Sequence, residues 1–265
     1  NNCVIIGNFI GVDATGTGSF GNDYNGIYIQ GWPSGSNANN NQIGGTNPGE
    51  RNVICSNGFG DVTVGRKRHG LQFDGATNCK VWGNYLGLGS DGTTILGNAQ
   101  DGISIYRLSN DNQIGGNTAA QRNISSGNEF GLFMQDNCQR NLILGNYFGT
   151  GVNGTIAKPN NSGGVAISWD SRNNYIGRAN AGEGNVISGN TEFGIQLRAD
   201  GPPNPCYNNF VENNYIGTDK TGLVALPNNK SGILFLGGAH DNIIGGTGAL
   251  QRLSLIHISE PTRLR

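Results

Sequence analysis

The sequence predicts an all-β fold: a single-stranded right-handed parallel β-helix of about seven coils, with three short strands per coil. Two recurring apolar motifs and an unusual composition predict it. Glycine supplies 46 of the 265 residues, and charged residues make up only 13% of the chain. Because glycine costs about 1 kcal/mol per helical position relative to alanine, this composition favours turns and short strands over helices.

The first motif, Gly-apolar-x-apolar, occurs seven times and marks one strand of each coil. Alternate residues of a strand point to opposite faces, so the two apolar residues face the core and the residue between them faces outward. The copies begin at Gly26, Gly70, Gly102, Gly131, Gly164, Gly194 and Gly232. The residues we expect to point inward in stacked rows include Ile103, Ile105, Leu132, Met134, Val165, Ile167, Ile195 and Leu197.

Two further apolar segments follow each copy of this motif. One has the pattern Asn-x-Ile, as in Asn112-Gln113-Ile114, and the other lies before the next glycine, as in Asn185-Val186-Ile187. Three short strands with no helical pattern between them describe one coil of a β-helix. Successive coils stack at about 4.8 Å, and crossovers between parallel strands are right-handed as a strong rule.

Asparagine recurs at equivalent turns, where its side chain can bond neighbouring backbone groups and form a ladder from coil to coil. One such column reads Cys3, Asn41, Cys79, Asn112, Asn141, Asn174, Asn209, Asn242. We expect the two cysteines of this column to be small buried groups. They lie two coils apart, about 9.6 Å, which is beyond disulfide reach. With five cysteines and no Cys-x-x-Cys, the sequence indicates neither a disulfide scaffold nor a zinc site.

The domain organisation follows from where the repeat starts and stops. We expect residues 1–252 to be one β-helix fragment, truncated at both ends, because the chain opens inside a repeat. Residues 253–265 resemble a translated sequencing-library adapter: asparagine follows Arg51 and Arg122, but Leu253 follows Arg252. We exclude this segment from the fold. Extra length at 32–40, 57–69 and 199–208 is expected to form loops.

The repeat as a whole resembles a known family. Segments such as Asn214-Tyr215-Ile216-Gly217-Thr218 and Arg51-Asn52-Val53-Ile54, together with the glycine motif, resemble the bacterial right-handed parallel β-helix repeat proteins. These belong to the carbohydrate-binding and sugar-hydrolase group, which includes the NosD-like repeats. The resemblance covers nearly everything from Cys3 to Arg252. It implies an extracellular or cell-surface location, and sugars that lie along the first strand of each coil and the turn after it.

Outward side chains on these strands and turns are the candidate binding residues. Aromatic rings suit the apolar faces of sugars, whereas carboxylates suit hydroxyl groups and could hold Ca²⁺ through oxygen ligands. The candidates are Tyr28, Trp32, Asp74, Tyr106, Asp136, Asp170, Arg172 and Asp200. By contrast, Tyr85, Tyr147 and Tyr215 share one repeat position, and we expect them to pack at a coil corner. The basic run at 66–69, which ends in His69, is interpreted as a charged loop tip, with a grip on an anionic polymer as the alternative.

The leading functional interpretation is a polysaccharide-associated surface module that is non-catalytic in this fragment. One alternative is a polysaccharide lyase or C5-epimerase acting on uronate polymers, and a second is a receptor binder like a phage tailspike. Catalytic residues stay unassigned, because the chain lacks the polygalacturonase-like motifs Asn-Thr-Asp, Asp-Asp and Gly-His-Gly, and shows no Ser-His-Asp pattern. A net charge of −1 gives no broad attraction to nucleic acid, and no apolar run is long enough to span a membrane.

Overall fold

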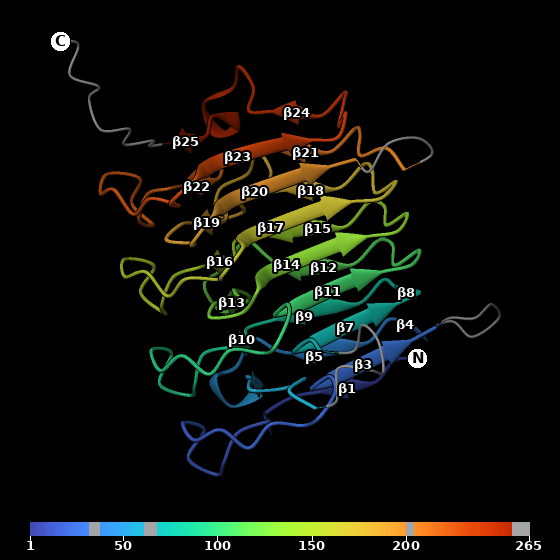
Figure 1. Cartoon of the computed structure of the whole chain (residues 1–265), viewed down its shortest axis with the longest axis vertical. Helices are drawn as coiled ribbons and strands as arrows, with labels where there is room; N and C mark the ends of the chain where they lie inside the picture. The colour runs from blue at the N-terminus through green and yellow to red at the C-terminus, as the bar shows by residue number, and fades with distance from the viewer. Residues whose placement is uncertain (32–37, 61–67, 200–203, 256–265) are drawn as a thin grey trace.

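The computed structural model is a parallel β-helix in which three sheets run along the length of a rod (Figure 1). It describes residues 1–31, 38–60, 68–199 and 204–255. Two sheets have eight strands and the third has seven. The strands pair in parallel with their equivalents one coil away, as β11 (Ile103–Tyr106) does with β7 (Leu71–Asp74) and β14 (Phe130–Gln135). The predicted fold class is confirmed.

Each sheet takes one strand from every coil. The β3–β23 sheet contains β3 (Ile27–Gln30), β7 (Leu71–Asp74), β11 (Ile103–Tyr106), β14 (Phe130–Gln135), β17 (Gly163–Ser168), β20 (Phe193–Arg198) and β23 (Ser231–Leu236). The β1–β24 sheet contains β1 (Val4–Ile5), β5 (Gln42–Gly44), β9 (Lys80–Trp82), β12 (Gln113–Gly115), β15 (Leu142–Leu144), β18 (Tyr175–Ile176), β21 (Phe210–Val211) and β24 (Ile243–Ile244). The β2–β25 sheet contains β2 (Phe9–Ile10), β6 (Val53–Ile54), β10 (Tyr85–Leu86), β13 (Ile124–Ser125), β16 (Tyr147–Phe148), β19 (Val186–Ile187), β22 (Tyr215–Ile216) and β25 (Ser254–Leu255).

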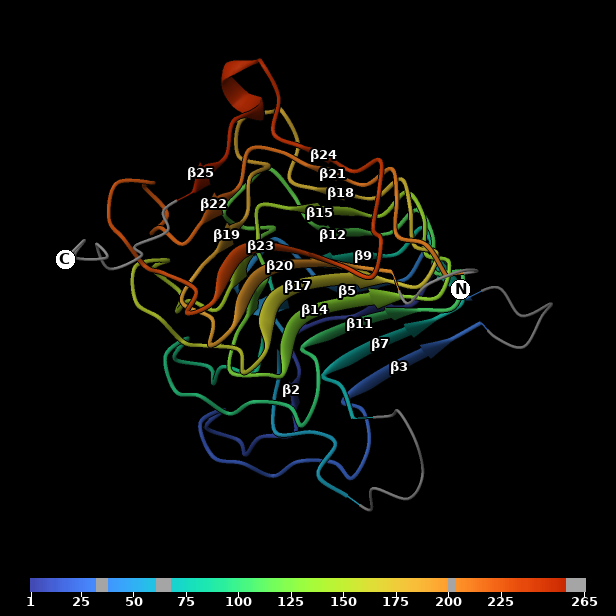
Figure 2. The ribbon, with the colours of Figure 1, turned by 45° about the horizontal axis from the view of Figure 1, so that its top comes forward.

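The chain visits the three sheets in turn, so the rod has seven complete coils and two strands of an eighth. Figure 2 shows the sheets as the walls of this solenoid. Two short strands, β4 (Ala38–Asn39) and β8 (Ala76–Thr77), pair beside it, so part of the loop predicted at 32–40 is a strand. The 3₁₀ helices η1 (Pro48–Glu50) and η3 (Ala249–Gln251) follow β5 and β24. Residues 32–37 of the loop at 32–40 and parts of those at 57–69 and 199–208 lie outside the described residues.

The core lies inside the solenoid and consists of the predicted rows. All eight residues that we expected to point inward are fully buried and belong to one cluster that runs along the rod. The glycine of the first motif is required by the approach of the next coil. A Cβ at Gly102 would lie 2.0 Å from the Ser125 Oγ and 2.8 Å from the Asn128 Nδ2 of the next coil, closer than a Cβ can pack.

Asparagine ladders bind each coil to the next. In the predicted column, for example, Asn141 Nδ2 donates to Asn174 Oδ1 at 3.0 Å, and the Asn141 main-chain N–H donates to the same oxygen. The structure contains two further ladders that the sequence analysis did not identify. One joins Asn8, Asn52, Asn84, Asn123, Asn146, Asn185 and Asn214. The other joins Asn22, Asn57, Asn98, Asn128, Asn160, Asn190 and Asn228, with the Asn128–Asn160 contact made from main-chain N–H to side chain.

The cysteines are free thiols, and four of the five are buried. The expectation of burial is confirmed for Cys79, which bridges Asn41 and Asn112 in its ladder. It is wrong for Cys3, which is exposed because it lies in the terminal coil, where no preceding coil covers it. Burial raises the pKa of the Cys55 and Cys206 thiols to about 12 and also raises the pKa of Cys79 and Cys138.

Only one cysteine is therefore expected to react quickly with a thiol reagent in the native protein. Alkylation requires the thiolate, and a thiol of raised pKa inside a core is both protonated and out of reach. Iodoacetamide at pH 8, followed by peptide mass mapping, should modify Cys3 within minutes and the other four only after denaturation. Rapid native labelling of Cys55 or Cys138 would contradict the packing of these coils.

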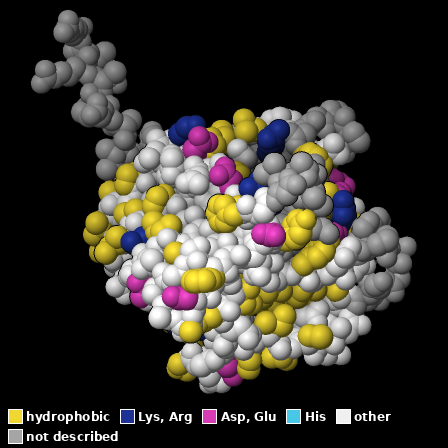
Figure 3. All heavy atoms as spheres, turned by 60° about the horizontal axis from the view of Figure 1, so that its bottom comes forward, with side chains coloured by type: hydrophobic (Ala, Val, Ile, Leu, Met, Phe, Trp, Pro, Cys, Tyr) yellow, Lys and Arg dark blue, Asp and Glu magenta, His cyan; other side chains and the backbone are white. Residues whose placement is uncertain are grey.

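The two ends of the rod differ from its middle. At the β1 end, hydrophobic side chains lie at the surface, including Val4 at 60% and Phe9 at 46% exposure (Figure 3). At the other end, Leu253 packs against the core and β25 pairs with β22. The first residues of segment 253–265 thus continue a sheet, while 256–265 lie outside the described residues. The boundary at residue 252 stays a prediction.

Within the described part of the chain, no helix is long and apolar enough to cross a membrane.

Candidate functional site

The outer face of the β3–β23 sheet carries stacked rows of outward side chains. In the row through the middle of the strands, register pairs Ser104 with Gln72 and with Phe133. In the row at the strand ends, it pairs Tyr106 with Asp74 and with Gln135, and Ser168 with Arg198. Small residues on β11 and β17 lie between larger ones, so this face is uneven.

Two hollows lie on this face. The first, of about 300 Å³, is lined by His69, Gln72, Gln100, Asp101, Ser104, Tyr106, Glu129, Phe130, Phe133 and Gln135. The second, of about 380 Å³, is lined by Phe130, Phe133, Gln135, Ser162, Ser168, Trp169, Glu192, Phe193, Gln196 and Arg198. Phe130 and Phe133 line both, and their rings stack at 5.4 Å between centroids. A stacked aromatic pair thus forms the wall between the two hollows.

The small residues of the repeat explain where the hollows lie. The first is open above Ser104, whose neighbours in the row are Gln72 and Phe133. The second lies above β17, where Ala166 pairs with Phe133 on one side and Gln196 on the other. β11 and β17 are two coils apart, about 9.6 Å along the rod. We call the two hollows and the aromatic wall together the outer groove.

Four of the predicted site residues lie close together beside the first hollow. Tyr28 Oη donates to Asp74 Oδ2 at 2.7 Å, and Arg107 Nη1 donates to the same oxygen at 3.2 Å. The Arg107 side chain also lies 4.0 Å from the Asp136 carboxylate and 4.5 Å from the centre of the Tyr106 ring. The stacked coils therefore bring Asp74 and Asp136 to one arginine, which the sequence analysis did not select.

The two carboxylate oxygens of Asp74 have different surroundings. Asp74 is only 2% exposed, and its Oδ1 has no hydrogen-bond partner among the described residues. Burial and the Asp74 carboxylate raise the pKa of the Tyr28 phenol, so this hydroxyl stays protonated as a donor. One carboxylate oxygen of Asp74 thus accepts from two donors, and the other is enclosed without a partner among the described residues.

The remaining predicted residues form a separate group or lie outside the described chain. Arg172 Nη1 lies 2.9 Å from Asp170 Oδ1 and donates to Asn137 Oδ1 at 2.9 Å, and its guanidinium lies above the Tyr207 ring. This pair is not among the residues that line either hollow. Trp32 and Asp200 lie outside the described residues.

The turn after the sheet strands is strained on three successive coils. Arg107 and Leu108, Asp136 and Asn137, and Trp169 and Asp170 all have positive φ between 42° and 67°. Such angles cost non-glycine residues about 1–3 kcal/mol each. Elsewhere the same turn uses glycine, as at Gly75 and Gly237. Among the described turns after this sheet, the strained non-glycine pairs follow β11, β14 and β17, three strands that border the outer groove.

The sequence analysis missed the residues that precede the glycine of each motif. In the structure four of these residues, His69, Asp101, Phe130 and Phe193, line the outer groove on the edge opposite the turn. The column reads Asn25, His69, Asp101, Phe130, Gly163, Phe193, Ser231. The residue type in this column varies between polar, aromatic and small. That variation could have marked the column as a functional position, because a purely structural position would repeat one residue type.

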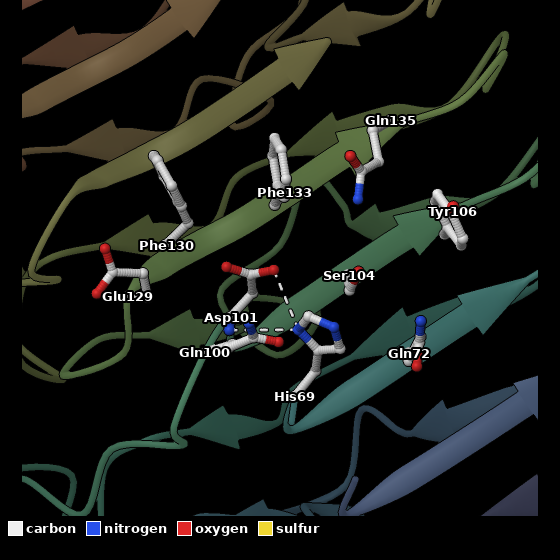
Figure 4. Close-up of a pocket in the computed structure, with 10 residues that line it drawn as sticks. All are labelled: His69, Gln72, Gln100, Asp101, Ser104, Tyr106, Glu129, Phe130, Phe133 and Gln135. Atoms are coloured by element: carbon white, nitrogen blue, oxygen red, sulfur yellow. Dashed lines mark hydrogen bonds and ion pairs between the residues drawn. The ribbon is translucent and has the colours of Figure 1, made fainter. Parts of the chain in front are cut away.

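Two titratable groups of this column form a buried pair. His69 and Asp101 are 6% and 3% exposed, and His69 Nδ1 lies 3.1 Å from Asp101 Oδ2. The imidazole presents its other nitrogen to the side of the hollow where Ser104 and Gln72 lie (Figure 4). Ser104, His69 and Asp101 thus line one hollow, although the sequence showed no such pattern. His69 is part of the groove, and its interpretation as part of a charged loop tip was wrong.

Tyr85, Tyr147 and Tyr215 pack as predicted, in a small cluster with Leu88 and Val186, but each begins a strand of the β2–β25 sheet (β10, β16 and β22) and does not lie at a corner. Arg51 and Arg122 cover the Tyr85 and Tyr147 rings at 4.1 and 4.2 Å. These tyrosines stabilise the β2–β25 wall and do not line the groove. Across the described residues, no group of three or more His, Cys, Asp or Glu is arranged to hold a metal ion, and the suggestion of Ca²⁺ stays a prediction.

The chain is a parallel β-helix with a polar and aromatic groove on one outer wall. Neither a protein-family model nor a curated protein matches it.

Proposed function

We propose that this protein is a polysaccharide-associated β-helix module of the bacterial carbohydrate-binding group, placed outside the cell or on its surface. In this proposal the outer groove binds a glycan chain that runs along the stacking axis. The resemblance of the repeat to that group supports the location and the class of ligand. The composition of the groove supports the place of binding.

The observation that carries the proposal is the aromatic wall between two polar hollows. Phe130 and Phe133 present ring faces at which the apolar faces of sugars can pack. Amides on either side, such as Gln72 and Gln196, offer donors and acceptors for hydroxyl groups. Because the hollows repeat along the rod at about 9.6 Å, a polymer with a repeating unit can occupy both.

The charges of the groove favour a neutral glycan in the first hollow. Asp101 and Glu129 line it, and no described Lys or Arg does. A uronate carboxylate would therefore be repelled there, which weighs against lyase or epimerase chemistry on uronate polymers at this site. Glu192 and Arg198 both line the second hollow. Because it carries both signs of charge, it accepts charged substituents of a glycan more readily than the first hollow does.

A Phe133→Ala variant is expected to bind glycan about tenfold more weakly than the wild type, because the stacking surface shared by both hollows is removed. The measurement is isothermal calorimetry with xylan, glucomannan, alginate and polygalacturonate, each with and without Ca²⁺. A Tyr106→Ala, Asp136→Ala double variant tests the adjoining cluster in the same way, and we expect binding to weaken there too.

The matched control is Phe210→Ala. Phe210 stacks on Tyr175 at 4.5 Å, but this aromatic pair lies on the β1–β24 sheet, away from the groove. We expect its loss to leave affinity unchanged. Equal weakening by both substitutions, or binding that survives Phe133→Ala and the double variant, would place the site elsewhere. No binding to any of the polysaccharides would contradict the proposal.

A further inference from the structure

The fold does not require a histidine and an aspartate in the first hollow. Their column, the residue before each motif glycine, contains Asn25 in the preceding coil and Phe130 and Gly163 in the following coils. All of these coils form with the same register. Hence nothing in the stacking of coils selects the His69–Asp101 pair, although burying two titratable groups costs folding energy.

The geometry of the pair defines the state of the imidazole. Nδ1 lies 3.1 Å from Asp101 Oδ2 and 3.4 Å from the main-chain nitrogen of Asp101. These contacts require opposite roles for Nδ1, as donor to the carboxylate or as acceptor from the N–H. The carboxylate contact is shorter and charge-assisted, so we assign the proton to Nδ1. The Nε2 lone pair of neutral His69 then faces the hollow, on the side of Ser104 and Gln72 (Figure 4).

Two amides beside this nitrogen have unused hydrogen-bonding capacity. Gln72 Oε1 accepts from Asn25 Nδ2 at 2.7 Å, which directs the Gln72 amino group toward the hollow (Figure 4). Gln100 also lines the hollow, and its Oε1 is buried with no partner among the described residues. The Gln72 amino group thus flanks the imidazole as a donor to an oxygen, whereas Gln100 Oε1 is enclosed by the protein.

We infer that His69, positioned by Asp101, is a general base that hydrolyses O-acyl esters on a glycan bound in the outer groove. The inference rests on the proposed glycan binding, because the groove brings the ester to the hollow. Among reactions on a polysaccharide, ester hydrolysis suits this site since the acyl group is neutral. The acidic lining of the hollow therefore does not repel it, as it would a uronate.

The reaction needs only water as co-reactant. His69 Nε2 takes a proton from water while the water oxygen bonds to the acyl carbon, and the carbonyl electron pair moves to its oxygen, where the Gln72 amide donates a hydrogen bond. When the carbonyl re-forms, the bond from the acyl carbon to the sugar oxygen breaks. The imidazolium returns its proton to that oxygen, giving a free carboxylic acid and a sugar hydroxyl. Asp101 holds the imidazole and stabilises its charged form.

The test compares acetate release by the full chain from acetylated xylan and acetylated glucomannan, with 4-methylumbelliferyl acetate as a small probe. His69→Asn is expected to lower kcat by about 100-fold or more. Asp101→Asn should lower kcat and leave KM unchanged, because Asp101 acts through His69. Both variants introduce the residue that Asn25 already provides in this column, so their melting temperatures should stay close to that of the wild type.

His240→Asn is the matched control. His240 Nδ1 also lies 2.9 Å from a carboxylate, that of Asp241, but this pair is exposed and lines neither hollow. Its substitution should leave acetate release unchanged. No release by the wild type, or equal release by the wild type and His69→Asn, would overturn the inference.

Calorimetry with the deacetylated polysaccharides separates this inference from the proposed function. Binding without hydrolysis would overturn only the catalytic role of His69. Hydrolysis of the small probe that depends on His69, without binding of any polysaccharide, would support the base and overturn the glycan as its substrate.

Discussion

Truncation of Phe148 to alanine is expected to lower the free energy of unfolding by about 3–5 kcal/mol. Phe148 is among the largest fully buried side chains, and it belongs to the cluster that runs along the rod. In the β2–β25 sheet, Phe148 pairs with Ser125 of the preceding coil and with Ile187 of the following coil. The cavity left by alanine would therefore open between these two coils. Neither backbone can move inward without breaking these parallel pairs, and the cavity would stay largely unfilled.

Urea denaturation followed by circular dichroism measures this loss. Phe148→Leu should cost less than Phe148→Ala, because leucine fills part of the cavity. Leu223→Ala is the matched control, since Leu223 is 85% exposed and should change stability by less than about 0.5 kcal/mol. A loss below about 1 kcal/mol for Phe148→Ala would show that this position is not part of a packed core.

Asn146→Ala is expected to destabilise the protein by at least about 3 kcal/mol, because it breaks a fully buried ladder on both sides. Asn146 Oδ1 accepts from the main chain and from the side chain of Asn123 at 3.2 and 3.0 Å. Its Nδ2 donates to Ile114 O at 2.9 Å and to Asn185 Oδ1 at 3.1 Å. Alanine leaves the two Asn123 donors without their acceptor, and it removes one donor each from Ile114 O and Asn185 Oδ1, in a site that water does not reach.

The same denaturation experiment checks this result. Asn153→Ala is the control, because Asn153 is exposed and lies outside the three ladders. Hydrogen exchange gives a second measure: the main-chain N–H of Asn123 should lose protection in Asn146→Ala, since its acceptor is removed. Wild-type stability together with unchanged protection would mean that the ladder contributes little to the stacking of coils.

The coils, their order and their core rows could be predicted because they depend on local periodicity. A strand of period two fixes which side chains share a face, and the glycine of each motif marks where the next coil approaches. Hence Leu132 and Ile167 could be assigned to the interior from spacing alone. One asparagine ladder could be recognised in the same way, as a column of one residue type.

The candidate site could be predicted only in part. Tyr28, Asp74, Tyr106 and Asp136 were selected as outward residues, but nothing in the spacing showed that one arginine contacts both acids. The other two ladders were missed because their residues come from motifs that look different along the chain, such as Asn123-Ile124 and Asn146-Tyr147. These motifs occupy the same position on one wall, and only the register of β13 and β16 shows it.

The sequence by itself determined that this chain is a solenoid, since every copy of the repeat carries the signals for its own strands and turns. The tertiary structure decided which side chains meet across coils. His69 and Asp101 are 32 residues apart in the chain and 3.1 Å apart in the fold. Both precede a motif glycine in successive coils, but only the packed structure shows that their side chains turn toward each other and line one hollow. The physical reason is that a repeat encodes the position of a residue within its coil, whereas a groove is built from contacts between coils.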